Sequence, residues 1–99
     1  MERIVKLGLL YDFYGELLTD HQKKVYEDYV YNDYSISEIA EEYEISRQGA
    51  SDLIKRINKI LEGYETKLKL VDRFDSIKSK IEAIESISDE DKELLLKEL

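Results

Sequence analysis

Four cationic side chains and three hydroxyl or amide side chains gather in one short stretch of the 99-residue chain. They are Ser46, Arg47, Gln48, Ser51, Lys55, Arg56 and Lys59. Arg and Gln can form paired hydrogen bonds with base edges, whereas Lys, Arg and Ser side chains bind phosphate oxygens. These residue types predict nucleic-acid contact. Arg47 and Gln48 would read bases, Ser46 and Ser51 would touch phosphate, and the three later cations would anchor the backbone.

Apart from Ser46, which precedes it, the same residues share one side of an expected helix. At about 100° per residue from Arg47, they fall between about 0° and 180°. The apolar residues fall between about 220° and 340° on the same wheel. These apolar residues are Ala50, Leu53, Ile54, Ile57, Ile60 and Leu61. One face is therefore core, and the other bears four cations against the single acid Asp52. Many exposed helical faces carry Lys and Arg for solvation alone, and that interpretation stays open.

A shorter helix is expected immediately before this one. Ser35 and Glu38 have the spacing of a capping box. The apolar stripe of this helix is Ile36, Ile39, Ala40 and Tyr43. Residues 44–46 form a turn, in which Ser46 can cap the following helix. Two helices joined in this way are typical of a helix-turn-helix, whose second helix enters the major groove. The turn lacks the usual Gly, and Glu44 stands there although a positive φ is uncommon for other residues.

Further helices precede this pair. Residues 3–14 predict an amphipathic helix with Ile4, Leu7, Tyr11 and Tyr14 on one stripe. We expect it to stop at Gly15, because Gly favours the left-handed position after a helix. Thr19 and Gln22 have capping-box spacing for the next helix. A polar break follows at residues 31–34.

The apolar pattern continues after Leu61 in steps of three or four residues. Its members are Tyr64, Leu68, Val71, Phe74, Ile77, Ile81 and Ile84. Gly63 could bend a helix here, since Gly costs about 1 kcal/mol relative to Ala. Ser88 can cap a last helix that carries four leucines. We expect a helix-turn-helix domain at 1–62 and a C-terminal helical extension at 63–99, used for packing or dimerisation.

Composition excludes several classes of chemistry. The chain has no Cys and one His, His21, so disulfides, zinc sites and a serine-type triad find no support. No glycine-rich phosphate loop occurs. No apolar run reaches the roughly 18 residues of a membrane span, and no secretory leader is visible. We expect an all-α cytoplasmic protein with no catalytic residue, metal, cofactor or membrane insertion.

The net charge of −8 argues against general nucleic-acid binding, because non-specific affinity comes from phosphate neutralisation. The charge is uneven, however. Residues 47–60 carry four cations and one acid, a local charge of +3, which leaves −11 for the rest of the chain. A small cationic face can still bind nucleic acid, or the acidic surface can meet a basic partner.

Several of these segments together resemble the bacterial YlxM family, which is similar to region 4 of sigma factors. The resemblance covers about residues 3–75. Its most specific part is the Phe-Tyr-Gly-Glu-Leu-Leu-Thr run from Phe13 to Thr19. Ser35 to Ala40, Ser46-Arg47-Gln48 and Ile54-Lys55-Arg56 also fit, whereas Gly49 and Ala50 depart from the expected pattern. The resemblance implies an all-helical, DNA-binding helix-turn-helix protein linked to the signal recognition particle.

Two functions from different classes follow. The first is a non-enzymatic regulator that binds DNA or RNA through the cationic face. The second is a protein-interaction adaptor whose partner is the GTPase of the signal recognition particle or its RNA. Self-association is a separate expectation, a homodimer, because the apolar stripes exceed what a monomer of this size easily buries.

Overall fold

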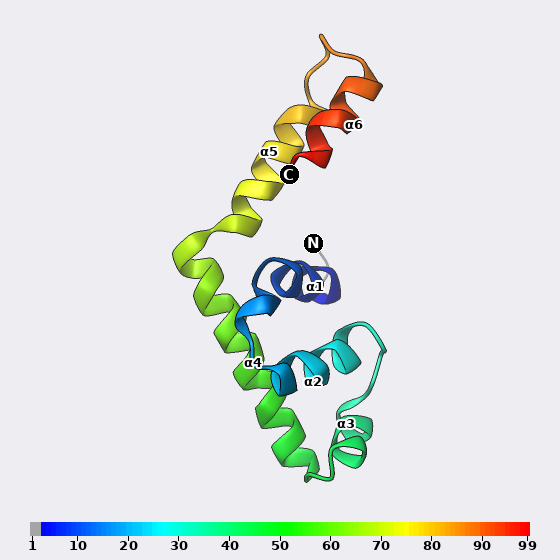
Figure 1. The fold of residues 1–99 in the computed structure, drawn as a ribbon, viewed down its shortest axis with the longest axis vertical. Helices are drawn as coiled ribbons and strands as arrows, with labels where there is room; N and C mark the ends of the chain where they lie inside the picture. Colours follow the sequence, from blue (N-terminus) through cyan, green and yellow to red (C-terminus); the bar gives the residue numbers. More distant parts are fainter. Residues whose placement is uncertain (1–2) are drawn as a thin grey trace. The chain divides into compact units, whose positions relative to one another are not determined.

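The computed structural model describes residues 3–99, apart from the side chain of Ile4, whose expected place on the first apolar stripe lies outside the described residues. The elements are α1 (Arg3–Tyr14), the short 3-10 helix η1 (Gly15–Leu17), α2 (Asp20–Val30), α3 (Ile36–Glu42), α4 (Arg47–Leu68), α5 (Leu70–Glu82) and α6 (Asp89–Lys97) (Figure 1). The described residues contain no strand, so the all-α prediction is confirmed. None of these helices is both long and apolar enough to cross a bilayer.

The chain divides into two compact units, Met1–Leu68 and Lys69–Leu99. We refer to them as the first and second units. The domain boundary expected after residue 62 stays a prediction.

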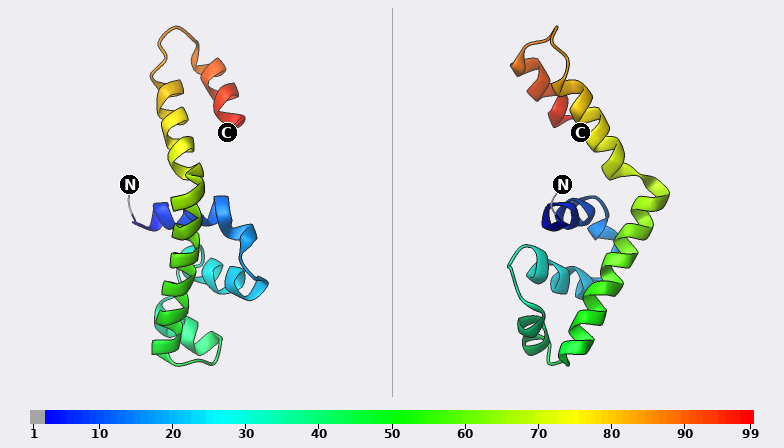
Figure 2. Two further views of the ribbon diagram at one scale, coloured as in Figure 1. Left: turned by 90° about the vertical axis from the view of Figure 1, so that its left-hand side faces the viewer. Right: turned by 180° about the vertical axis from the view of Figure 1, so that it is seen from behind.

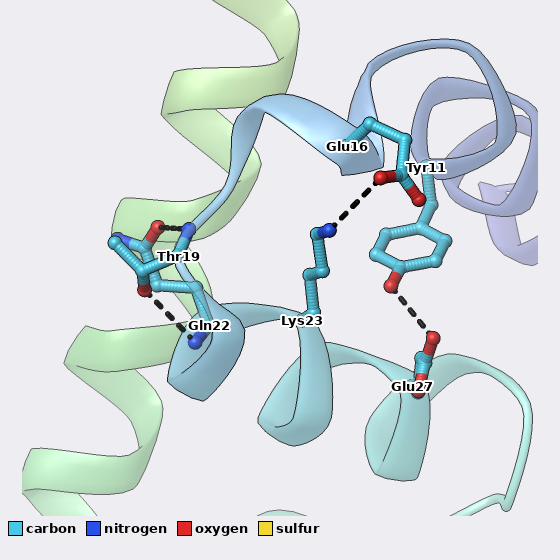
Figure 3. Close-up of polar contacts among 6 residues, drawn as sticks. All are labelled: Tyr11, Glu16, Thr19, Gln22, Lys23 and Glu27. Carbon is cyan, nitrogen blue, oxygen red and sulfur yellow. Dashed lines mark hydrogen bonds and ion pairs between the residues drawn. The ribbon is translucent and has the colours of Figure 1, made fainter.

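Side-chain caps start the helices where the sequence predicts them. Thr19 and Gln22 form a reciprocal capping box at α2, with the Gln22 amide N–H donating to Thr19 Oγ1 over 3.2 Å (Figure 3). Ser35 and Glu38 form the same arrangement at α3. Each cap satisfies backbone donors that the first helical turn leaves without a partner. These local hydrogen bonds fix where α2 and α3 begin.

The core of the first unit lies between α4 and the three helices before it. Helices α1, α2 and α3 lie along one side of α4, with α3 beside its N-terminal end (Figures 1 and 2). The buried apolar residues are Leu7, Leu10, Tyr14, Leu18, Val25, Tyr26, Val30, Ile39, Ala40, Ala50, Ile54, Ile57 and Leu61. Helix α4 contributes four of them, at the spacing of a single helical stripe. Burial of this stripe holds α4 in place.

Tyrosine hydroxyls supply polar links between these helices. Tyr11 donates to Glu27 over 2.8 Å and so joins α1 to α2 (Figure 3). Tyr31, just after α2, donates to Asp12 of α1 over 2.6 Å. Tyrosine suits such positions because its ring packs against apolar neighbours while its hydroxyl reaches a polar partner.

Glycine acts at Gly15 in a different way from the one expected. Helix α1 ends at Tyr14, but Gly15 does not take a positive φ and instead begins η1. The reason for Gly is space, because a Cβ there would lie 2.9 Å from Cε1 of Tyr11. The helix end was predicted correctly, and its left-handed explanation was wrong.

The bend considered at Gly63 does not interrupt the helix. Helix α4 continues through Gly63 to Leu68, and the next residue, Lys69, has a φ of 55°. One Gly costs only about 1 kcal/mol within a helix, which its neighbours' hydrogen bonds and packing offset.

The second unit is a helical hairpin in which α6 packs against α5 (Figure 2). Ser88 caps α6 as predicted, accepting a hydrogen bond from the Asp91 amide over 3.1 Å. Lys92 donates to the main-chain oxygen of Glu82 over 3.1 Å and ties the two helices. Several large apolar side chains stay exposed in this hairpin: Leu70, Ile77, Ile84, Leu94, Leu95 and Leu99.

Candidate nucleic-acid interface

The turn between α3 and α4 is a Schellman motif built without glycine. Glu44 takes a left-handed φ of 55°. The Ile45 amide donates to the Ala40 carbonyl over 2.9 Å, and the Glu44 amide approaches the Glu41 carbonyl at 3.4 Å. These bonds satisfy the last carbonyls of α3. The turn therefore has the geometry that a helix-turn-helix needs, with Glu44 in a conformation that L residues adopt at a cost of about 1–2 kcal/mol.

Ser46 caps α4 as the sequence predicts. Its Oγ accepts the Gly49 amide hydrogen over 2.9 Å. A Cβ at position 49 would lie 3.1 Å from that oxygen, so Gly49 leaves room for the cap. The Ser46 hydroxyl accepts in this bond, so its own hydrogen remains available to a phosphate oxygen.

The expected outward face of α4 is exposed. Arg47, Gln48, Lys55, Arg56 and Lys59 are all exposed, and Ser51 is half-buried. The opposite residues of the helical wheel are buried or half-buried, which includes Ala50 and Ile57 at 0% exposure. The structure thus confirms the two-faced character of α4, with the predicted site residues of the helix itself on its outward side, and their role in binding stays a prediction.

The cations of this face have no acidic partner within the described part of the chain. Among residues 3–99, Arg47, Lys55, Arg56 and Lys59 form no ion pair with a carboxylate. Ion pairing within the protein would have to be broken before a phosphate could bind, and here that cost is absent.

One polar pair does lie on this face. The Gln48 side-chain amide donates to Asp52 Oδ1 over 2.9 Å, one helical turn later. Both residues are exposed.

Polar residues at the border of the outward face hold α4 to the rest of the unit. Tyr14 of α1 donates to Glu65 over 2.5 Å. Tyr26 of α2, which is 0% exposed, donates to Asn58. These bonds fix the rotation of α4 about its own axis, and the rotation decides which side chains face solvent. Local sequence patterns do not mark Glu65 or Asn58 as linking residues, because their partners lie 51 and 32 residues away.

The helix before the turn is held in a similar way. Tyr43 follows α3 and donates a hydrogen bond to Asp28 of α2. Burial, and then this hydrogen bond, raise the pKa of Tyr43 above its usual value near 10. The hydroxyl therefore remains protonated at neutral pH, and the link between α2 and the end of α3 is retained.

The surroundings of the turn on the α3 side are acidic. Glu38, Glu41, Glu42 and Glu44 are exposed and, with Tyr34, line a shallow open concavity. The cationic face of α4 and this acidic surface of α3 therefore lie on consecutive helices.

Two further kinds of site, one built on the single histidine and one on clustered metal ligands, can be compared with the structure. His21 is exposed, and its ring meets the ring of Tyr43 edge-on with the centroids 5.8 Å apart. Among residues 3–99, no three His, Asp or Glu side chains come together as a metal site would require.

Comparison with known proteins agrees with this geometry. Residues 1–99 match the family described as "UPF0122: Putative helix-turn-helix protein, YlxM / p13 like". A UPF0122 protein of Caldanaerobacter subterraneus is 53% identical over 78 residues, covering 79% of this chain and 67% of the relative. The UPF0122 protein YlxM of Bacillus subtilis is 42% identical over 97 residues, covering 95% of this chain and 88% of its own length.

Proposed function

The chain belongs to the YlxM/p13-like family of helix-turn-helix proteins, and from this premise we propose that it is a non-enzymatic, DNA-binding regulator or accessory factor of the cytoplasm. In this proposal α4 is the recognition helix. Arg47 and Gln48 near its start meet base edges, and Ser46 and Ser51 meet phosphate. Lys55, Arg56 and Lys59, farther along the helix, bind the phosphate backbone of the DNA.

One observation carries this proposal. The outward face of α4 presents four exposed cations that form no ion pair with a carboxylate of residues 3–99, in a protein whose net charge is −8. A helix needs no such concentration of one sign for solvation. Binding to nucleic acid explains this cluster of positive charges, because each contact with a phosphate releases condensed counterions.

A salt titration of binding tests the proposal. Fluorescence anisotropy would follow labelled duplex DNA, and separately the RNA of the signal recognition particle, as salt is raised. In Arg47→Ala plus Lys55→Ala, loss of the Lys55 phosphate contact should lower the log–log salt slope for a duplex by about 0.9, and loss of the Arg47 base contact should lower the affinity further. Unchanged affinity and slope in that variant would remove both residues from the interface.

The matched control removes two cations elsewhere. Lys24→Ala plus Lys78→Ala takes the same charge from exposed positions on α2 and α5. Direct contact through α4 predicts that this control keeps the slope of the unmodified protein. Equal losses in the two variants would show that net charge, and not the α4 surface, governs binding.

A second candidate function rests on the acidic surface of α3. Exposed Glu38, Glu41, Glu42 and Glu44 around an open concavity favour a basic protein partner. The family resemblance implies the GTPase of the signal recognition particle as that partner. The chain would then be an adaptor that keeps the helix-turn-helix fold without reading a DNA sequence.

A pull-down with purified GTPase, with and without its RNA, separates this function from the first. Glu41→Lys plus Glu42→Lys should abolish capture and leave α4 intact, whereas Arg47→Ala plus Lys55→Ala should leave capture unchanged. Capture that needs RNA and is lost only in the α4 variant would instead support the nucleic-acid function.

We also propose that the C-terminal extension, residues 63–99, supports a homodimer. The exposed Ile77, Leu94 and Leu95 belong to a two-helix hairpin of about 31 residues. Hairpins of that size bury too little apolar surface to be stable alone. A second copy of the hairpin would cover these side chains.

Light scattering measures this directly. The dimer should have twice the 11.7 kDa of one chain. Ile77→Ser plus Leu94→Ser should give the monomer mass, whereas Leu17→Ser, at 56% exposure in the first unit, should leave the dimer intact. A monomer mass for the unmodified protein at tens of micromolar would exclude the dimer.

A further inference from the structure

A single carboxylate lies within the cationic face of α4. Between Arg47 and Lys59 the only acid is Asp52. Its Oδ1 accepts the Gln48 side-chain amide over 2.9 Å. A negative charge on a surface that meets phosphate weakens non-specific binding. A role for Asp52 in binding must therefore come from what it does to Gln48.

The chemistry of this pair fixes the orientation of the Gln48 amide. An ionised carboxylate only accepts hydrogen bonds, so the amide nitrogen of Gln48, and not its oxygen, must face Asp52. The nitrogen has a second hydrogen, and Oε1 is not used in this pair. The exposed end of Gln48 therefore presents one donor beside one acceptor in a fixed arrangement.

Adenine matches that arrangement in the major groove. Its edge offers the N6 amine as donor and N7 as acceptor, whereas guanine offers two acceptors, N7 and O6. Resting on the DNA binding proposed above, we propose that Asp52 is a positioning residue that orients Gln48 to favour adenine over guanine. Asp52 thereby lowers the overall affinity for duplex DNA and raises the preference for adenine.

Two variants of nearly the same shape separate the roles of charge and orientation. In Asp52→Asn the partner both donates and accepts, so either face of the Gln48 amide can point outward. In Asp52→Glu a carboxylate still accepts from position 48, because the two residues remain one turn apart. Helical circular dichroism would verify that both variants fold.

In the experiment, each protein captures short duplexes from a pool of random sequence, and the captured duplexes are sequenced. Fluorescence anisotropy then measures the affinity for duplexes with adenine or guanine at the enriched position. The unmodified protein and Asp52→Glu should prefer adenine by about fivefold or more. Asp52→Asn should bind the unselected pool more tightly and prefer adenine by less than about twofold, a level below that of one good base contact. A helix-stabilising role alone would not move these two quantities in opposite directions.

The failures are distinguishable. If no duplex is bound, both the DNA-binding function and the role of Asp52 are wrong. If duplexes are bound without a preference for adenine, or with one that Asp52→Asn retains, only the role of Asp52 is wrong.

Discussion

Replacing Glu44 by Gly tests the turn that sets α3 against α4. Glu44 has a φ of 55°, which costs an L residue about 1–2 kcal/mol and glycine almost nothing. Glycine also gives the unfolded chain more freedom, which subtracts about 0.5–1 kcal/mol from that gain. The net expectation is a stabilisation of about 0.5–1 kcal/mol. For a domain of this size it corresponds to a rise in melting temperature of about 2–8 °C, followed by circular dichroism.

Two controls isolate the backbone as the cause. Glu44→Ala removes the same carboxylate but keeps a Cβ, so its stability should stay within about 0.5 kcal/mol of the unmodified protein. Glu41→Gly places glycine inside α3, where it should destabilise by about 1 kcal/mol. If Glu44→Gly melts no higher than Glu44→Ala, backbone strain at position 44 is not the cause, because relief of charge repulsion would then explain any gain.

Three further predictions concern the first unit. Ile57→Ala, at 0% exposure, should cost about 2–5 kcal/mol in urea unfolding, whereas Leu17→Ala, at 56% exposure, should cost less than about 1 kcal/mol. Tyr26→Phe leaves Asn58 Oδ1 without its donor and should cost about 1–2 kcal/mol in the same assay. Partial burial, and then the hydrogen bond to Asp12, raise the pKa of Tyr31 to about 12. A raised folded-state pKa gives stability that is complete below the unfolded value near 10 and is lost between about pH 10 and 12. Tyr31→Phe should flatten that alkaline decline, measured as melting temperature against pH.

Features determined by neighbouring residues were predictable from the sequence. The caps at Thr19, Ser35, Ser46 and Ser88 each involve a partner three residues away, so spacing alone reveals them. The two faces of α4 follow from the same kind of information, because burial repeats with the helical period. The left-handed conformation of Glu44 is an exception, because the residue type argues against a positive φ there, whereas the hydrogen bonds of the turn are formed with one.

Features that depend on distant residues were not predictable. The hydrogen bond from Tyr14 to Glu65 spans 51 positions, and nothing in the local pattern distinguishes Glu65 from the other carboxylates of an acidic chain. The end of α4 is a similar case. Gly63 looks like the weakest point of that helix, yet the helix continues to Leu68 because the hydrogen bonds and packing around one Gly outweigh its cost.

The placement of charge on α3 and α4 sets a condition on the proposed function. Phosphates near the start of α4 would meet Ser46 and, across the turn, the exposed acids Glu41 and Glu42. Salt screens exposed charges beyond about 8 Å at physiological ionic strength, so the α3 acids oppose binding most strongly at low salt. Contacts of Lys55, Arg56 and Lys59 with phosphate weaken as salt rises. The observed salt slope should therefore be shallower than the number of phosphate contacts alone predicts. Glu41→Gln plus Glu42→Gln should steepen it by raising affinity at low salt more than at high salt. An unchanged slope in that variant would mean that nucleic acid approaches α4 from the side away from α3.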